Sequence, residues 1–394
     1  LAVFEIAMAV VLVIGATLAA RSLSKLMAVR LGFRTDHIIT MKANFSKHAC
    51  ESAKSGDGES CWLYISGALT NMRGIASVRS AAAASTLPIS TWAVAPNVQI
   101  EGRSKEPSLS NGDVIADRIV STDYFRTLGI RLLTGREFLA SDSAEAGRVA
   151  VVDDTFARKY LGNEALGQRI SWRNDAKGNP EWMEVVGVIS AVHDLRLEAP
   201  PRPEIYIPFA QADVFQGANF IVRTSENPTA MTSALKNAIW AVDKETPITA
   251  VWTMDQIVSD SLAAPRYQTI LLAAFGGLGL LLAMVGIYGV ISYGVSQRTH
   301  EIGVRMALGA HRGSILAMVI WEGMLIAFMG IAAGVLGAIG LGRFLQSLLF
   351  QIKPTDPATF VGVAVALLLV AMAACYVPAR RAMRVDPMVA LRHE

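Results

Sequence analysis

Charged residues are scarce in this chain. Asp, Glu, Lys and Arg make up 18% of its 394 residues, whereas hydrophobic residues make up 52%. A soluble globular chain averages about 25% charged residues, so the composition favours a membrane protein before any motif is considered. The net charge of +3 is also too small to favour a nucleic-acid-binding protein.

The usual signatures of enzyme chemistry are also absent from the sequence. It has no G-x-x-x-x-G-K-[ST] phosphate-binding loop and no G-x-S-x-G nucleophile motif. His300-Glu301 does not begin an H-E-x-x-H zinc motif, because Val304 replaces the second histidine. The six histidines are scattered, and His193-Asp194 is predicted to be a surface turn. We therefore predict no catalytic residue, no cofactor site and no metal site in this chain.

Cysteine is rare, with three residues in the whole sequence. Cys375 lies in an apolar run, whereas Cys50 and Cys61 flank a polar stretch. In an oxidising compartment Cys50 and Cys61 could form a disulfide. The alternative is two free thiols, because spacing alone does not fix the geometry that a disulfide needs.

Long apolar runs are the feature that the chain has in excess. They cover residues 1–20, 269–293, 314–341 and 358–377. Each is long enough for a helix to cross a bilayer, which needs about 20 apolar residues. A signal peptide is the alternative for the first run, but its basic residues follow the apolar segment instead of preceding it. The sequence thus predicts four transmembrane helices.

Basic residues predict the orientation of these helices. Arg298, Arg305 and Arg312 lie between the second and third runs, and Arg380 and Arg381 follow the fourth. The positive-inside rule places both segments in the cytoplasm, and the two assignments agree because two spans separate them. Residues 21–266 are then outside and both termini inside. The four basic residues within 21–34 disagree, but the rule is weak for long translocated domains.

The region between the first and second runs is polar and mixed, and it predicts an α/β (α+β) domain. Short apolar strands are expected at 149–152 and 185–189, a helix end followed by an extended run at 74–80, and a helix at 229–242. The proline-rich segment 200–208 suits an edge strand or an extended connection. The fold class is therefore a multi-pass α-helical membrane protein with an extracytoplasmic α/β domain inserted between helices 1 and 2. The predicted domains are 1–26, 27–264 and 265–394.

Two acidic residues fall inside the predicted spans. Glu322 lies in the third and Glu5 in the first. An ionisable residue within a span is a candidate functional residue. The alternative is a carboxyl near the inner interface or facing a neighbouring helix, which we favour because the other spans offer almost no charged partner.

Several motifs resemble those of FtsX-like permeases of the MacB type. The membrane motifs lie at 286–293, at 297–305 (Q-R-T-H-E-I-G-V-R) and in the tail 378–392. The motifs of the middle region lie at 124–130, 135–138, 167–170 and 201–206. The resemblance covers essentially the whole chain in order. It departs at His300, where the family more often has a charged residue, and in a polar insert around residues 48–60.

The resemblance implies an ABC transporter permease in the bacterial inner membrane with a periplasmic core domain. A separate cytoplasmic MacB-type ATPase would bind ATP and Mg and drive motion that the permease passes to the outer domain. The implied partners are a second permease unit (a homodimer or a fused duplicate half), a periplasmic adaptor and an outer-membrane channel. The first apolar run resembles the start of the second half of duplicated permeases, in which one polypeptide carries two such units. Two alternatives stay open: a regulator of an extracytoplasmic enzyme, and a secondary transporter.

Residues 297–312 resemble the family's coupling helix, where the ATPase docks. We expect the contact residues to be Arg298, Glu301, Ile302, Arg305, Met306 and Gly309. Ile302 and Met306 are four residues apart and share one helical face, so we expect both to be exposed when the partner is absent. The alternative is a solvated basic loop.

Overall fold

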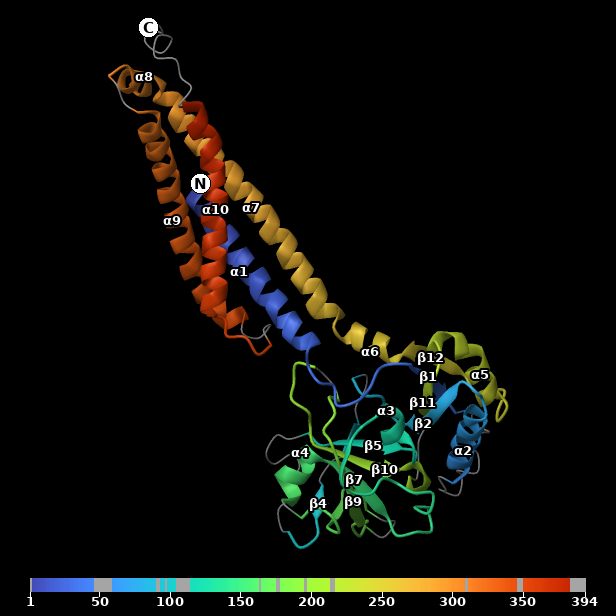
Figure 1. Ribbon diagram of the computed structural model, residues 1–394. Coiled ribbons are helices and arrows are strands. Elements are labelled where there is room, and N and C mark those ends of the chain that lie inside the picture. The colour runs from blue at the N-terminus through green and yellow to red at the C-terminus, as the bar shows by residue number, and fades with distance from the viewer. Residues whose placement is uncertain are drawn as a thin grey trace. The chain divides into compact units, whose positions relative to one another are not determined.

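The computed structural model describes residues 2–45, 59–89, 93–95, 98–103, 114–162, 164–174, 178–194, 197–212, 217–308, 311–345 and 350–382 (Figure 1). The chain divides into two compact units. Leu1–Ala28 with Leu262–Glu394 form one, which we call the helical unit, and Val29–Ser261 form the other, which we call the inserted domain.

Four helices of the helical unit are long and apolar enough to cross a membrane, which confirms the predicted spans. They are α1 (Ala2–Met27), α7 (Ala263–Gln297), α9 (Arg312–Leu345) and α10 (Pro357–Ala382). The short helix α8 (Thr299–Ala307) joins α7 to α9. Helix α7 is 35 residues long and extends past the predicted 269–293 at both ends.

Helix α1 packs against α7, α9 and α10, and two glycines of α9 allow its close approach. A Cβ added at Gly330 would lie 2.6 Å from the Cβ of Ile6, and one at Gly334 would lie 2.5 Å from the Cβ of Val10. Neither distance is compatible with a real side chain. Small residues at these positions bring the two backbones together, as is common between membrane helices.

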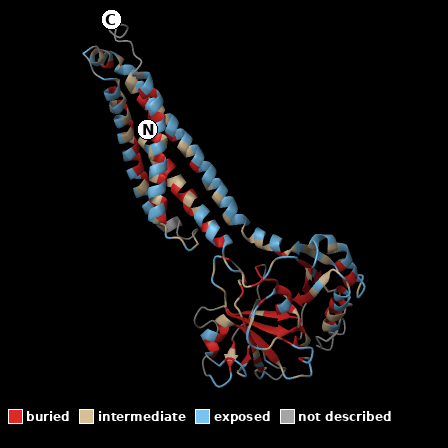
Figure 2. Cartoon of the chain, viewed as in Figure 1, coloured by how far each residue is buried: buried red, intermediate tan, exposed pale blue. Residues whose placement is uncertain are grey.

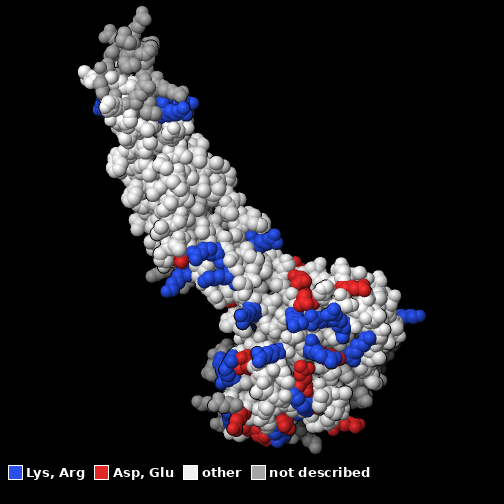
Figure 3. Space-filling view, in the orientation of Figure 1, with Lys and Arg blue, Asp and Glu red and all other residues white. Residues whose placement is uncertain are grey.

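The outer surface of the helical unit is apolar. Large hydrophobic side chains such as Leu282, Val285, Phe328 and Leu336 are exposed there, and Figure 2 shows pale blue along the outward sides of these helices. Figure 3 shows that the middle of this surface carries no Lys, Arg, Asp or Glu on the face drawn, whereas basic residues gather toward both ends. Such a surface suits lipid contact.

The inserted domain is built on one mixed sheet with strand order β12-β1-β11-β2-β5-β10-β7-β9-β8-β4, to which β3 adds beside β5 and β6 beside β9. The strands are β1 (Ile38–Asn44), β2 (Val78–Ala84), β3 (Ala93–Val94), β4 (Gln99–Ile100), β5 (Ala116–Val120), β6 (Leu132–Gly135), β7 (Val149–Asp153), β8 (Arg169–Ser171), β9 (Met183–Ile189), β10 (Glu204–Pro208), β11 (Gly217–Thr224) and β12 (Ile248–Thr253). The helical elements are α2 (Glu59–Arg73), α3 (Tyr124–Leu128), α4 (Asp154–Phe156), the π-helix η2 (Ala157–Leu161), the 3-10 helices η3 (Phe209–Gln211) and η4 (Pro228–Met231), α5 (Thr232–Trp240) and α6 (Met254–Ser261).

Alternation along the strands decides which face of the sheet forms the core. On β1, Ile39 and Met41 point to the side covered by α2 and α5, and they are fully buried there. Thr40 and Lys42 point to the opposite side. The predicted α/β class is confirmed, as are the strands at 149–152 and 185–189 and the helix within 229–242.

The expected edge position of segment 200–208 is wrong. Strand β10 lies inside the sheet, parallel to β5 and antiparallel to β7. Pro200, Pro201 and Pro203 precede the strand and Pro208 ends it. Proline is usually confined to edge strands because it has no N–H group to donate to a neighbouring strand. In β10 no proline lies in the middle of the strand, so the strand can occupy an interior position.

Candidate functional site

The predicted coupling segment forms helix α8. Its sequence, Thr-His-Glu-Ile-Gly-Val-Arg-Met-Ala, carries Glu301 in the first turn and Arg305 in the last. This charge order suits the helix dipole, and an i,i+4 ion pair of 2.6 Å joins the two side chains. Arg298, in a non-helical conformation, separates α7 from α8 and so allows the chain to turn.

Ile302 and Met306 do not form an exposed apolar face. The Ile302 side chain is only 2% exposed and belongs to the core of the helical unit, and Met306 packs partly buried against the same core. The expectation that both stay exposed without a partner is wrong. Helical spacing puts the two residues on one face, but that face is the one turned toward the bundle.

Polar contacts also hold α8 to α9. Arg298 Nη1 lies 2.6 Å from Glu322 Oε1, and Arg305 Nη1 lies 3.1 Å from the sulfur of Met318. Glu322, the acidic residue that the sequence placed in the third span, is therefore paired with the segment before α8. Arg298, Ile302 and Glu322 also line a cavity of about 260 Å³ between α7, α8 and α9.

The outward side of α8 is polar except at its end. His300, Glu301 and Arg305 are exposed, and Leu308 is 84% exposed. Glu301 and Arg305 are one turn apart on α8, and Leu308 is the residue at which the helix ends. Burial of this exposed leucine by a protein partner would stabilise the complex.

The remaining predictions concern Gly309, the three cysteines and metal ligands. Gly309 and Cys50 lie outside the described residues. Cys61 is buried at α2 and is not without a partner, but its pairing with Cys50 stays a prediction. Cys375 is buried and has a free thiol. Within the described ranges no cluster of His, Cys, Asp or Glu could hold a metal ion.

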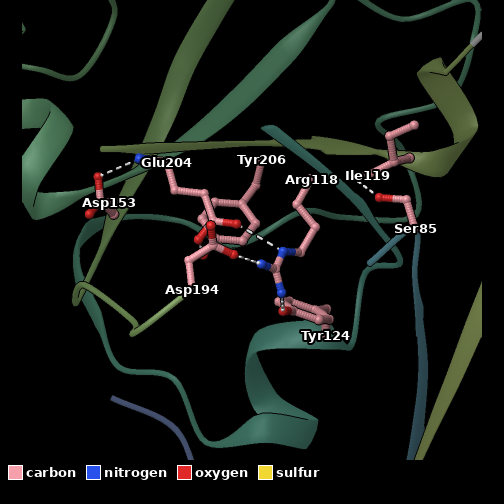
Figure 4. A network of polar contacts seen from close by, with 8 residues as sticks. All are labelled: Ser85, Arg118, Ile119, Tyr124, Asp153, Asp194, Glu204 and Tyr206. Carbon is pink, nitrogen blue, oxygen red and sulfur yellow. Dashed lines mark hydrogen bonds and ion pairs between the residues drawn. The ribbon is translucent and has the colours of Figure 1, made fainter. Parts of the chain in front are cut away.

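The inserted domain contains a buried ionic network that sequence reasoning missed (Figure 4). Arg118 of β5 is 1% exposed, and each of its nitrogens has a different partner. Nε donates to Glu204 at 2.8 Å, Nη1 to the Tyr124 hydroxyl at 3.0 Å, and Nη2 to Asp194 at 2.6 Å. The Tyr206 hydroxyl donates to the other oxygen of Glu204.

The prediction that Asp194 lies in a surface turn is wrong. Its side chain is 1% exposed and paired with Arg118. Burial raises the pKa of the carboxyls of Asp194 and Glu204, and the guanidinium of Arg118 opposes the rise. The network joins β5, β10, α3 and the segment after β9, so it fixes these elements to one another. A signal was present in the sequence: Arg118 and Glu204 each stand within a short strand beside apolar residues.

Asp153, at the end of β7, extends this network. Its Oδ1 accepts hydrogen bonds from the backbone nitrogens of Phe156 at 2.8 Å and Glu204 at 3.0 Å. Burial, with a smaller contribution from the Glu204 carboxylate, raises the pKa of Asp153 from 3.8 to about 7. This carboxyl therefore changes charge near neutral pH inside the domain.

Comparison with known proteins places both units in one family. The sequence model of the MacB-like periplasmic core domain matches residues 1–239, and that of the FtsX-like permease C-terminal domain matches residues 273–387. The first alone covers more than half of the chain.

Curated relatives agree with these matches. The macrolide export ATP-binding/permease protein MacB of Sodalis glossinidius is 28% identical over 324 residues, which are 76% of this chain and 47% of that protein. The uncharacterized ABC transporter permease YknZ of Bacillus subtilis is 24% identical over 281 residues, which are 70% of this chain and 69% of that protein. The chain thus spans about half the length of the MacB relative.

A solved structure, the periplasmic region of MacB from Actinobacillus actinomycetemcomitans, covers 60% of this chain and 97% of its own length. Its TM-score of 0.38 and its identity of 15% are too low to carry an argument. The family assignment depends instead on the two sequence models, which match the membrane and inserted parts in the order that the fold requires. This chain belongs to the FtsX-like, MacB-type family of ABC transporter permeases.

Proposed function

We propose that this chain passes the ATP-driven motion of a cytoplasmic ATPase to its extracytoplasmic domain, which exports or releases a substrate already outside the membrane. The ATPase would be a separate MacB-type subunit that binds ATP and Mg, since this sequence has no phosphate-binding loop.

The observation that carries the proposal is the continuity of α7. This helix runs unbroken over 35 residues from Ala263 to Gln297, and at 1.5 Å per residue its length is about 52 Å. The hydrocarbon core of a bilayer is about 30 Å thick, so the helix is longer than a span requires. It is connected through Leu262 to α6 of the inserted domain and through Arg298 to α8. One unbroken helix, α7, therefore lies between Arg298, which adjoins α8, and Leu262, which adjoins α6.

Helix α8 has the features of the dock. Ile302 and Met306 hold it on the bundle, while Glu301, Arg305 and Leu308 face outward. Full burial of a leucine side chain contributes roughly 1.5–3 kcal/mol before the costs of association. Contact with the ATPase at these three residues would apply force to α8. The residue before this helix, Arg298, is held to α9 by its ion pair with Glu322.

The spanning helices favour this mechanism over a secondary transporter. A transporter needs paired charges or interrupted helices near the middle of the membrane. In the described parts of the four helices, Glu5 and Glu322 are the only acidic residues. Glu322 forms an ion pair with Arg298, the residue before α8. The spanning helices therefore offer few charged side chains that could line a path for a hydrophilic substrate.

The proposed setting is the bacterial inner membrane, with the inserted domain in the periplasm and a second permease unit completing the transporter. A periplasmic adaptor and an outer-membrane channel are the further partners. The relative named for macrolide export supports export over regulation of an extracytoplasmic enzyme. Purification from native membranes tests this choice: a cell-wall hydrolase as the main extracytoplasmic partner would favour regulation.

Docking is tested by replacing Leu308 with Asp. In vesicles that contain the chain, we expect recruitment of the MacB-type ATPase to fall about tenfold or more, because a charge replaces the apolar anchor. The matched control is Leu63→Asp, a leucine of α2 that is 61% exposed in the inserted domain. This variant should recruit the ATPase as the wild type does. Equal recruitment by Leu308→Asp and the wild type would show that α8 is not the dock.

A further inference from the structure

A second cavity lies in the inserted domain, away from the core. It has a volume of about 360 Å³ and is formed by one face of β12, β1 and β11 together with α6. Thr40 is opposite Trp252 in the strand register, and Lys42 is opposite Ala250 on one side and Asn219 on the other. These residues share the face of the sheet that α2 and α5 leave uncovered. The volume is within the range of about 300–1,000 Å³ that is typical of small-molecule sites.

The polar side chains of the cavity floor already make hydrogen bonds within the protein. The Thr40 hydroxyl donates to the carbonyl oxygen of Trp252 at 3.0 Å, and the Asn219 amide donates to the carbonyl oxygen of Ser85 at 2.9 Å. The Ser85 hydroxyl accepts from the backbone nitrogen of Ile119 at 3.1 Å. These polar groups of the floor are engaged within the protein. Recognition of a ligand therefore depends on the other side chains that line the cavity.

The lining of the cavity combines apolar and charged side chains. Leu87 and Ile89 are buried aliphatic residues of the lining, Ile257 is half-buried, and Trp252 is 48% exposed. An aromatic ring that is half exposed in a cavity offers a large, rigid contact at low entropic cost. The apolar part of the lining therefore suits an aliphatic or aromatic group.

Two charged side chains of opposite sign line the same cavity. Lys42 comes from β1 and Asp260 from α6. Within the described part of the chain, neither side chain makes a hydrogen bond or an ion pair, and no ion pair joins the two to each other. A lining that offers one cation, one anion and apolar side chains complements a ligand that carries both charges and an apolar body.

The backbone at the cavity wall is held in a strained conformation. Ile89 has a φ of 61°, in the left-handed region that β-branched residues rarely adopt. Its nitrogen donates to the carbonyl oxygen of Asp194 at 2.5 Å, and the side chain of Asp194 is fixed by Arg118. Strain of this kind persists only where the surroundings enforce it, and it is concentrated at functional sites. The buried network thus holds one wall of the cavity in place.

We propose that this cavity binds a small zwitterionic amphiphile, with an aliphatic or aromatic body, one carboxylate that pairs with Lys42 and one ammonium that pairs with Asp260. Short peptides with free ends have this chemistry. The proposal goes beyond the proposed function, because binding needs no ATPase and is measured without one. Helix α6 supplies Asp260 and is followed after Leu262 by α7, so the ligand would touch the element that connects to the membrane helices.

The test uses the full chain in lipid nanodiscs and the dipeptide leucyl-4-fluorophenylalanine, followed by fluorine NMR. The wild type should bind the zwitterionic probe with a submillimolar Kd. Its N-acetylated form should bind about three- to fivefold more weakly, and its C-amidated form likewise, as expected for solvent-exposed ion pairs. Trp252→Ala should weaken all three probes by about thirtyfold.

Single charge removals then assign each end of the ligand. Asp260→Ala should abolish the preference for a free ammonium and keep the preference for a free carboxylate, and Lys42→Ala should do the reverse. Asp255→Ala is the matched control, because Asp255 is exposed on α6 but does not line the cavity. No binding by the wild type at roughly 1 mM probe, or preferences that Lys42→Ala and Asp260→Ala leave unchanged, would overturn the proposal.

Discussion

Replacing Asp153 with Asn isolates the effect of one buried charge on the stability of the inserted domain. Asn keeps the oxygen that accepts from the nitrogens of Phe156 and Glu204, and it resembles the protonated acid. The folded-state pKa of Asp153 is raised from 3.8 to about 7. A raised carboxyl pKa means that the folded state binds the proton more tightly than the unfolded state does.

The sign and the pH window follow from this shift. The stabilisation by the protonated carboxyl is fully present below the unfolded pKa of 3.8 and is lost as pH rises through about 7. One pKa unit corresponds to about 1.4 kcal/mol. The titration of Asp153 should therefore lower the free energy of unfolding by about 3 kcal/mol between about pH 5 and about pH 8. The Asn variant lacks this contribution and should be the more stable protein at the higher pH.

Urea unfolding of the inserted domain in the detergent-solubilised full chain measures this difference, with hydrogen exchange in β7 and β10 as a local probe. The carboxyls of Asp194 and Glu204, whose pKa values burial also raises, titrate in both proteins. The comparison of variant with wild type at each pH removes most of their contribution. A wild type and a variant with parallel pH profiles would refute the assignment of the raised pKa to Asp153.

Four further outcomes are expected. Gly334→Val should lower the free energy of unfolding of the helical unit by about 1–3 kcal/mol, because the new side chain collides with α1. Gly340→Val should not, because the space around Gly340 is open. Equal effects of the two variants would contradict the packing of α1 on α9. Ile302→Ala should cost about 2–5 kcal/mol of stability, as for a buried isoleucine, and a neutral result would mean that α8 is not packed on the bundle. After replacement of the natural cysteines, an impermeant thiol reagent added outside should label Gly147→Cys and should miss Gly313→Cys until the membrane is opened; both positions have free space for the side chain, and the reverse pattern would invert the topology. The purified chain alone should hydrolyse no ATP, and sustained hydrolysis free of partner would contradict the assignment of that chemistry to a separate subunit.

Much of the architecture could be predicted from the sequence, because it depends on local composition. Crossing a bilayer requires a long apolar helix, so the apolar runs predicted α1, α7, α9 and α10 without knowledge of their packing. Strands β7 and β9 were predicted because each is a short apolar run between turn signals. The family followed from contiguous motifs such as residues 297–305.

The tertiary structure decided which side of each element is buried. Helical spacing places Ile302 and Met306 together, but only their packing in the core of the helical unit shows that their face turns inward and leaves Leu308 outside. Arg118 and Glu204 are 86 residues apart in sequence, and no local pattern predicts that two strands bring them within 2.8 Å. The interior place of β10 and the cavity beneath α6 arise in the same way. Each depends on which strands pair, and pairing is set by the burial of distant residues together and not by the residues of any one segment.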